Sequence, residues 1–193
     1  IAITETNAIN LLDVDTANGP ITITSGGAMV ATDVVSTTDA DANDITLTAT
    51  VGDVTLGIVT AGAGVAADVT ITATTGSINE IGAGDVAVDI TGDVVTLTAQ
   101  DEIGGVSELN IETTANSLTA ASTLVGDIYI TETNAITLTS VTTTDGLINI
   151  VSGGAMTVTL VTAGGDTGSN DDVTLTTTAG DIIMSGDITA LND

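Results

Sequence analysis

Apolar and polar residues alternate along most of this chain, with threonine facing away from valine, isoleucine or leucine. The alternation is clearest in six short segments, residues 21–24, 45–48, 69–72, 95–98, 136–139 and 173–176. A period of two residues is typical of a β-strand with one buried face, and no segment keeps the 3.6-residue period of an amphipathic helix. Glycine, asparagine and aspartate separate the segments, so the pattern predicts an all-β fold.

The spacing of the strand starts indicates which all-β fold this is. Most starts recur every 20 to 25 residues and fall into three columns. The first column contains Ile1, Ile21, Ile45, Val69, Val94, Ile128, Ile148 and Val173, and the second contains Ile9, Met29, Val54, Ile78, Ile103, Ile136, Met156 and Ile182. The third contains Val14, Val34, Ile58, Val86, Leu109, Val141, Val161 and Ile188. Three short strands per coil, stacked in register, predict a right-handed parallel β-helix (a β-solenoid) of about nine coils. A β-sandwich would instead need tight hairpins between neighbouring strands.

A long internal repeat overlies this short period. Residues 1–34 return without a gap as residues 128–161, and more than half of the aligned positions are identical. Chance agreement between segments of this composition would be far lower, so the repeat is genuine. We therefore expect one β-helical domain over residues 1–193, with a long repeat over 1–127 and a partial second copy over 128–193.

Gly-Asp pairs mark many of the expected turns, for example Gly52-Asp53, Gly126-Asp127 and Gly180-Asp181. Glycine permits a positive φ at a turn, and an aspartate side chain can accept hydrogen bonds from nearby backbone N–H groups. The sequence therefore predicts that these aspartates cap the backbone of their own turns.

The charge of the chain excludes several classes of function. The chain has 26 Asp and Glu residues and no Lys, Arg, His or Cys. Nucleic acids and anionic membrane surfaces are bound through Lys and Arg, so neither is expected as a partner. No apolar run approaches the ~20 residues of a membrane-spanning helix, and no disulfide can form. Disorder is also disfavoured, because 42% of the residues are hydrophobic and regularly spaced.

Two acidic loops suggest a metal site. Asp39, Asp41, Asn43 and Asp44 place four oxygen-bearing side chains within six residues, and the equivalent loop of the second copy holds Asp166, Asn170, Asp171 and Asp172. Ca²⁺ prefers six to eight oxygen ligands, which alternate residues of a loop can supply. The first loop departs from an EF-hand, because Asp44 stands at the sixth position, where glycine is expected. We expect no obligatory cofactor, with Ca²⁺ as the ion that these eight residues would hold and a solvated acidic loop as the alternative.

Enzymatic activity is not expected. Parallel β-helices include polysaccharide lyases and hydrolases, but their chemistry generally uses a His, Lys or Arg, or a bound cation. The pair Asp13 and Asp15 could act on a glycosidic bond, yet Tyr129 is the one aromatic residue in the chain that could stack on a sugar.

The repeats resemble those of a known family. Residues 126–136, 21–28 and 173–182 are similar to the repeat region of filamentous-haemagglutinin-like bacterial surface proteins, and residues 101–111 are similar to an interrupted coil of that region. The resemblance covers nearly the whole chain. It implies a right-handed β-helical shaft, secretion to the cell surface or the extracellular space, and a place in adhesion or in an extracellular fibre.

These observations together predict a structural role. We expect the chain to be a shaft of an extracellular bacterial filament or of a giant surface protein, built by stacking of β-helical coils. Its partners would be further copies of itself, head to tail, or neighbouring repeats of a longer chain, together with divalent cations. A stalk segment of a secreted adhesin is one alternative. An ice-binding solenoid is another. It would require one wide face with threonine in register on every coil, and the varied length of the loops after the first column argues against it.

Overall fold

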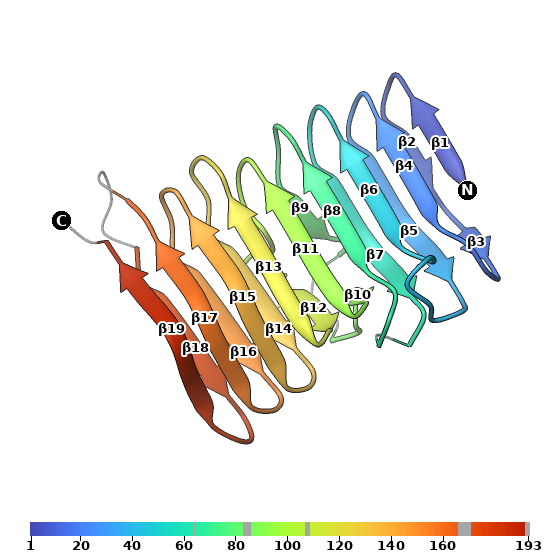
Figure 1. Cartoon of the computed structure of the whole chain (residues 1–193). Coiled ribbons are helices and arrows are strands. Elements are labelled where there is room, and N and C mark those ends of the chain that lie inside the picture. Colours follow the sequence, from blue (N-terminus) through green and yellow to red (C-terminus); the bar gives the residue numbers. More distant parts are fainter. Residues whose placement is uncertain (64, 83–85, 107–108, 166–170, 192–193) are drawn as a thin grey trace.

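The chain winds into a parallel β-solenoid in the computed structural model, which describes all residues except 64, 83–85, 107–108, 166–170 and 192–193. Two sheets face each other across a narrow apolar core, and the strands of each sheet lie side by side along the solenoid axis (Figure 1). The chain rises through the front sheet and descends through the rear sheet as it advances, which is a right-handed winding (Figure 1). The predicted fold class is confirmed.

The front sheet has nine strands, called here the nine-stranded sheet. In spatial order these are β1 (Ala2–Glu5), β4 (Ile21–Ser25), β6 (Ile45–Ala49), β8 (Val69–Ala73), β11 (Val94–Ala99), β13 (Ser117–Ser122), β15 (Ile136–Thr143), β17 (Met156–Ala163) and β19 (Ile182–Ala190).

The rear sheet has ten strands, called here the ten-stranded sheet. It contains β2 (Ile9–Leu11), β3 (Val14–Thr16), β5 (Met29–Ser36), β7 (Val54–Ala61), β9 (Ile78–Glu80), β10 (Ile90–Thr91), β12 (Ile111–Thr114), β14 (Ile128–Glu132), β16 (Ile148–Ser152) and β18 (Val173–Thr177). Two pairs of strands share a level, since β2 and β3 both pair with β5, and β9 and β10 both pair with β7. The ten strands therefore make eight levels, slightly fewer than the nine coils expected.

The second and third columns of strand starts lie on one sheet in most coils. In β5, for example, Met29 and Val34 both point into the core, and two consecutive residues between them face outward. This outward pair interrupts the alternation without changing the register with β7, so one eight-residue strand presents two inward-facing segments. Each coil therefore has one short face and one long face, rather than three separate sheets.

The core is a set of aliphatic rows that run along the axis. Ile21, Ile45, Val69 and Val95 stack in one such row through the parallel register of β4, β6, β8 and β11, and all four are fully buried. Each residue therefore contacts the same type of side chain above and below it. A narrow interior of this kind is filled by Ile, Val, Leu and Ala without any aromatic side chain.

The two copies of the long repeat use opposite sheets. Residues 2–5 form β1 of the nine-stranded sheet, whereas their equivalents form β14 of the ten-stranded sheet, and β4 and β16 show the same exchange. The sequence column that runs from Val94 to Ile128 is therefore not a column in space. Val95 of β11 stacks with Leu118, and Ile128 stacks with Ile103. This part of the prediction is wrong because the chain crosses between the two sheets an odd number of times within one 127-residue period. Equivalent strands of the two copies therefore lie on opposite sheets.

The exchange occurs around residues 100–127, where the short face moves from one sheet to the other. The strands β4, β6 and β8 have five residues on the nine-stranded sheet, and β14, β16 and β18 have five residues on the ten-stranded sheet. Throughout the described residues the chain forms no helix, so there is none that could span a membrane.

Candidate functional site

Three buried carboxyl groups meet inside the solenoid, next to the levels where the winding is irregular. They belong to Glu80 at the end of β9, Asp89 before β10 and Glu112 on β12, and they are called here the carboxyl triad. One oxygen of each lies within 4.8 Å of the others, and all three side chains are buried. No other group of three carboxylates approaches this closely in the part of the chain that the structure describes.

The backbone holds the triad in place. Both β9 and β10 pair with β7, and β10 also pairs with β12, so the three residues come from neighbouring levels of the ten-stranded sheet. The Asp89 N–H donates to the Glu112 carbonyl oxygen at 3.0 Å, and the Glu112 N–H donates to Asp89 Oδ2 at 2.9 Å. Asn110 Nδ2 donates to Glu112 Oε1 at 2.9 Å. The carboxyl groups therefore cannot separate without breaking sheet hydrogen bonds.

The electrostatics of the triad follow from its burial and from the lack of cationic residues. Burial, together with the negative charges of Glu112 and Glu80, raises the pKa of Asp89 to about 8, although the hydrogen bond from the Glu112 backbone N–H opposes the shift. Because the chain has no Lys, Arg or His, protons or cations from solution must neutralise these carboxylates. The triad can therefore hold protons near neutral pH, or a hard cation such as Ca²⁺ on its oxygen ligands.

A fourth buried acid, Glu132, joins two successive coils at the turn between the sheets. Its Oε1 accepts the Asn134 N–H at 2.9 Å, and its Oε2 accepts the Thr113 hydroxyl at 2.8 Å and the Ala115 N–H at 3.0 Å. Desolvation raises the pKa of Glu132 despite these hydrogen bonds. The side chain therefore ties its own turn to the turn of the preceding coil.

The equivalent residue of the first repeat copy, Glu5, makes the first half of this arrangement. Its Oε1 accepts the Asn7 N–H at 3.0 Å, and hydrogen bonds from the Asn7 and Thr6 backbone lower the pKa of its half-buried carboxyl group. No coil lies beneath it in this structure, since β1 is an edge strand of the nine-stranded sheet.

The residues predicted to bind calcium lie in loops, where several of their side chains form hydrogen bonds with the backbone. The Asp39 carboxylate accepts N–H groups of residues 65–67 at 3.0–3.2 Å, and its pKa is lowered because these hydrogen bonds outweigh its desolvation. Asn43 is buried and donates to Asn18 Oδ1 and to the Thr38 carbonyl oxygen. Asp41 is exposed.

The remaining predicted ligands show a similar pattern. Asp44 Oδ1 accepts the Asp68 N–H at 3.0 Å, and Asp171 Oδ1 accepts the Gly146 N–H at 3.1 Å. Asp172 is exposed, and Asp166 and Asn170 lie outside the described residues. Among the residues described, neither loop gathers three carboxylates as closely as the triad does. Calcium binding in these loops stays a prediction.

The turn aspartates cap the neighbouring coil. Asp53 Oδ1 accepts the Ser77 N–H at 2.9 Å, Asp127 Oδ1 accepts the Leu147 N–H at 2.9 Å, and Asp68 Oδ1 accepts the Val94 N–H at 3.1 Å. Each partner is 20 to 26 residues away in the chain. The prediction that Asp53 and Asp127 cap their own turns is therefore wrong, because the stacked turn of the next coil presents its N–H groups closer to the side chain.

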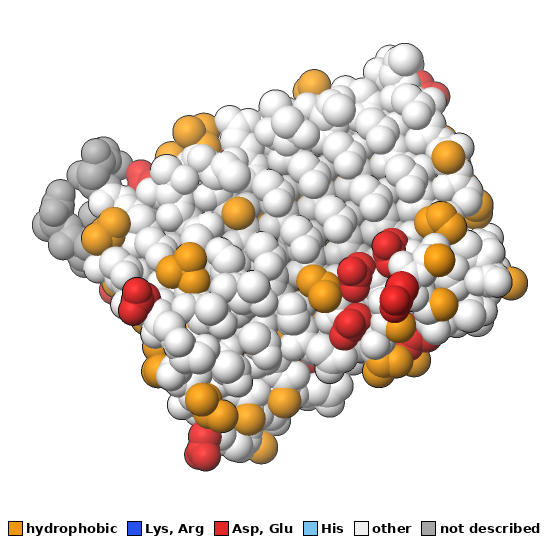
Figure 2. Space-filling model, viewed as in Figure 1, with side chains coloured by type: hydrophobic (Ala, Val, Ile, Leu, Met, Phe, Trp, Pro, Cys, Tyr) orange, Lys and Arg blue, Asp and Glu red, His pale blue; other side chains and the backbone are white. Residues whose placement is uncertain are grey.

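The outer side of the nine-stranded sheet carries two ranks of threonine. Thr22, Thr46, Thr70 and Thr96 align in one rank, and Thr24, Thr48, Thr72 and Thr98 align in the other, over the four consecutive strands β4, β6, β8 and β11. Figure 2 shows that this face is mostly free of charged side chains, with acidic groups gathered toward one edge. The two ranks are called here the threonine array.

The fold and these features define a parallel β-solenoid whose turns are capped by carboxylates. No protein-family model, no curated protein and no solved structure shows a significant match to the chain. The candidate sites therefore rest on the geometry of this chain.

Sequence reasoning did not find the triad or Glu132. A signal for two of these four acids is present in strand parity, since Glu80 has the same parity as buried Ile78, and Glu132 has that of Ile128 and Ile130. Glu112 follows Ile111 directly and breaks this rule, because both residues are buried in β12. Asp89 precedes a strand of only two residues, so alternation could not predict its orientation.

Proposed function

We propose that the chain is a structural shaft of an extracellular bacterial filament or giant surface protein of the filamentous-haemagglutinin-like kind, continued at its ends by further β-coils. A stalk segment of a secreted adhesin would use the same architecture. The support is that the same core rows and capped turns repeat from coil to coil, so each coil presents a template for the next.

The observation that carries this proposal is the apolar surface at the β19 end. Ile182, Met184 and Ile188 are 40%, 49% and 41% exposed, whereas fully buried residues of β17 lie directly beneath them in register. One further coil would cover these side chains in the same way. Half-exposed apolar rows beside an open strand edge are a surface onto which another strand can pair.

The long repeat supplies a register for the next coil. Strand β14, the repeat equivalent of β1, stacks on β12 within the ten-stranded sheet, and β18 is the outer strand of that sheet. A second copy of β1 on β18 would place Ile3 over Leu175 and Glu5 over Thr177. Glu5 would then occupy the position over a threonine that Glu132 occupies over Thr113. The stacking is thus compatible with both the apolar rows and the turn carboxylates.

A tandem protein with two copies joined from Asp193 to Ile1 tests this stacking. We expect one cooperative unfolding transition and a Tm at least about 5 °C above that of the single chain, because the junction buries two end surfaces. Calorimetry and denaturant unfolding measure both quantities.

The same substitution placed twice provides the matched control for the tandem protein. Met184→Asp in the first copy lies at the junction and should remove the gain in Tm, whereas Met184→Asp in the second copy lies at the free end and should cost little. Two independent transitions at the Tm of the single chain, with equal effects of the two substitutions, would refute the proposed stacking.

A second candidate function is favoured by the threonine array, which we propose as a surface that orders water or binds a crystal such as ice. Strands lie about 4.8 Å apart, and alternate residues of a strand lie about 6.7 Å apart, so the eight hydroxyl groups form a regular lattice. The β-branched threonine side chain is stiff at χ1, which keeps this lattice ordered. The in-register ranks supply on four coils the feature that the ice-binding alternative required on every coil, and one rank ends at β13, where Ala121 pairs with Thr98.

Thermal hysteresis and ice-crystal shaping test this second candidate. Replacing Thr72 by tyrosine, near the centre of the array, should abolish at least about nine-tenths of the hysteresis, because one bulky side chain lifts the neighbouring hydroxyl groups off a flat surface. The control is Thr174→Tyr on β18, outside the array. If the unsubstituted chain neither depresses the freezing point nor shapes crystals, the threonine array has only a structural role.

A further inference from the structure

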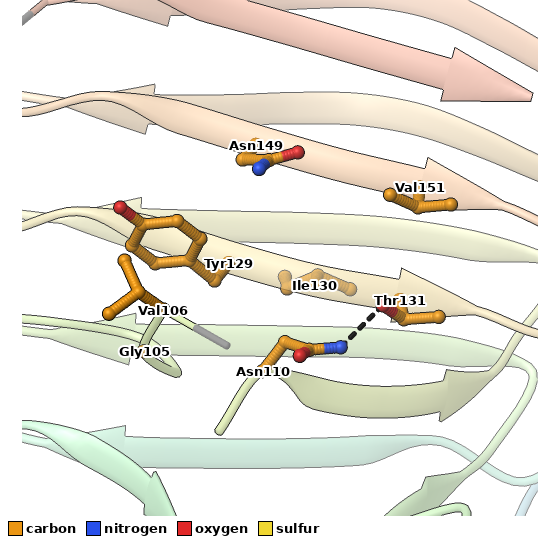
Figure 3. A pocket seen from close by; sticks show the side chains of 8 residues that line it. All are labelled: Gly105, Val106, Asn110, Tyr129, Ile130, Thr131, Asn149 and Val151. Atoms are coloured by element: carbon orange, nitrogen blue, oxygen red, sulfur yellow. Dashed lines mark hydrogen bonds between the residues drawn. The ribbon is translucent and has the colours of Figure 1, made fainter. Parts of the chain in front are cut away.

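A groove lies on the outer side of the ten-stranded sheet, over β14 and β16. Its volume is about 280 Å³, and its lining includes Tyr129, Thr131, Asn149 and Val151 from these strands. Val106 and Asn110 lie beside them, on the chain segment around the antiparallel bridge between residues 105 and 109 (Figure 3). The groove therefore combines a flat sheet surface with a raised wall.

The groove lies where the two repeat copies differ. Tyr129, Asn149 and Val151 replace Ala2, Thr22 and Thr24 of the first copy. The inward-facing residues of the same strands are unchanged, namely Ile128, Ile130, Glu132, Ile148, Ile150 and Ser152, which match Ile1, Ile3, Glu5, Ile21, Ile23 and Ser25. The substitutions thus alter the outer surface of this segment and leave its core as it was, which is the pattern that a specialised surface site would produce.

The polar groups of the groove are arranged for hydroxyl groups. Asn110 Nδ2 donates to Thr131 Oγ1 and to Glu112 Oε1, so both of its N–H hydrogens are used and its Oδ1 is the atom left to accept a hydrogen bond. The Thr131 hydroxyl accepts from Asn110 and can therefore donate its own hydrogen. The Asn149 amide adds a further donor and acceptor on the adjacent strand (Figure 3).

Tyr129 adds a flat aromatic surface next to these polar groups. It is the one aromatic residue in the whole chain, and its hydroxyl lies 3.5 Å from Asp127 Oδ2. Partial burial raises the pKa of the Tyr129 hydroxyl, with additional contributions from Asp127 and Glu102. An apolar ring beside amide and hydroxyl groups suits a ligand that has a C–H face and a hydroxyl edge.

We propose that this groove binds a neutral carbohydrate. The C–H face of a sugar ring would lie on Tyr129, with Asn110, Thr131 and Asn149 hydrogen-bonded to its hydroxyl groups. Acidic sugars are disfavoured because the surroundings contain Asp127 and Glu102 and the chain offers no Lys or Arg to pair with a carboxylate or sulfate. The proposal is independent of the structural role, since a shaft needs no groove.

Tyrosine fluorescence measures binding at this groove directly, because Tyr129 is the one aromatic fluorophore of the chain. The probes are the methyl glycosides and β-linked disaccharides of glucose, galactose, mannose and N-acetylglucosamine, with a galacturonic acid disaccharide as the acidic comparison. We expect a saturable change with at least one neutral probe, at about millimolar Kd. The absence of any change with all neutral probes, or tighter binding of the acidic disaccharide, would overturn the proposal.

Substitutions that restore the residues of the first copy test the contacts without changing the core. Asn149→Thr keeps the fluorophore and should weaken binding by at least about tenfold, and Tyr129→Ala, followed by calorimetry, should weaken it by a similar or greater factor. The control is Ala2→Tyr, which places a tyrosine at the equivalent position of the first copy, where Thr22 and Thr24 stand in place of Asn149 and Val151. Unchanged affinity in both groove variants would overturn the assignment of the site.

Discussion

The Asp89→Asn variant is expected to be more thermostable than the unsubstituted chain at pH 9, and to lose most of the dependence of stability on pH between about pH 4 and pH 8. Asparagine retains an oxygen that can accept the Glu112 N–H, and its volume is nearly the same. It removes an ionisable group whose burial next to Glu112 and Glu80 is costly.

The direction of this effect follows from proton linkage. The pKa of Asp89 is raised from 3.8 to about 8 in the folded chain, so the folded state binds more protons than the unfolded state between these values. The free energy of unfolding therefore falls as the pH rises through this window, and the loss is complete above about pH 8. A shift of this size corresponds to at most on the order of 5 kcal/mol, and the coupling to Glu112 and Glu80 distributes it over the triad.

Thermal unfolding followed by circular dichroism from pH 4 to pH 9, at constant ionic strength, measures the effect. The Tm of the variant at pH 9 should exceed that of the unsubstituted chain by about 10 °C. Asp13→Asn is the control, because Asp13 is exposed and its substitution removes the same formal charge. Parallel curves for the Asp89 variant and the unsubstituted chain would show that the triad does not set the pH dependence.

Calcium distinguishes the two ways of neutralising the triad. If the triad holds a cation, added Ca²⁺ should raise the Tm of the unsubstituted chain at pH 8, and the increase should be smaller in Asp89→Asn. An equal increase in both proteins would place the calcium effect elsewhere, for example in the loops that contain Asp39 and Asp171.

The fold class could be predicted from the sequence because every coil repeats the same alternation of inward- and outward-facing residues at nearly the same spacing. Alternation identified the inward-facing residues of β4, β6, β8 and β11, and the 20–25-residue spacing indicated the coil. The exchange of sheets between the repeat copies could not be predicted, because alternation gives the phase of a side chain within a strand and not the sheet to which that strand belongs. The pairings of Ile103 with Ile128 and of Val95 with Leu118 reveal it in the structure.

The candidate sites were less predictable for a related reason. The threonine array follows directly from alternation once the strands are in register, so its hydroxyl ranks could be expected. The triad depends on Asp89, which precedes the two-residue strand β10, and on Glu112 in the short strand β12, where no periodic pattern applies. The groove depends on Gly105, Val106 and Asn110 lying beside β14 and β16, an arrangement that brings together segments without any repeat relation.

The Gly153→Ala variant is expected to lose about 3 kcal/mol or more of the free energy of unfolding. A Cβ atom at this position would lie 2.0 Å from the backbone oxygen of Thr133 and 2.7 Å from its carbonyl carbon. Backbone atoms cannot move aside by a rotamer change, and the Gly153 N–H is hydrogen-bonded at 2.8 Å to the carbonyl oxygen of Glu132 on the preceding coil. The added methyl group must therefore separate two stacked coils.

Gly82→Ala is the matched control for this loss. Gly82 has a φ of +88°, and a Cβ atom there would meet nothing within 4 Å, so alanine should cost only the backbone strain of about 1 kcal/mol. Urea unfolding of both variants isolates the contribution of the close contact at Gly153. Equal losses in the two variants would show that the turns are not stacked as tightly as the structure has them.

Gly26→Ala shows how much of the loss in unfolding free energy depends on where the close contact lies along the solenoid. A Cβ atom at Gly26 would also lie 2.0 Å from a backbone oxygen, that of Thr6. Thr6 follows the edge strand β1, whereas Thr133 lies between coils on both sides. The outer turn can move away while the inner turn cannot, so the loss at Gly26 should be smaller than the loss at Gly153 despite the same contact distance. In the tandem protein, Gly26→Ala in the second copy should cost as much as Gly153→Ala, because its turn is then covered by a coil on either side.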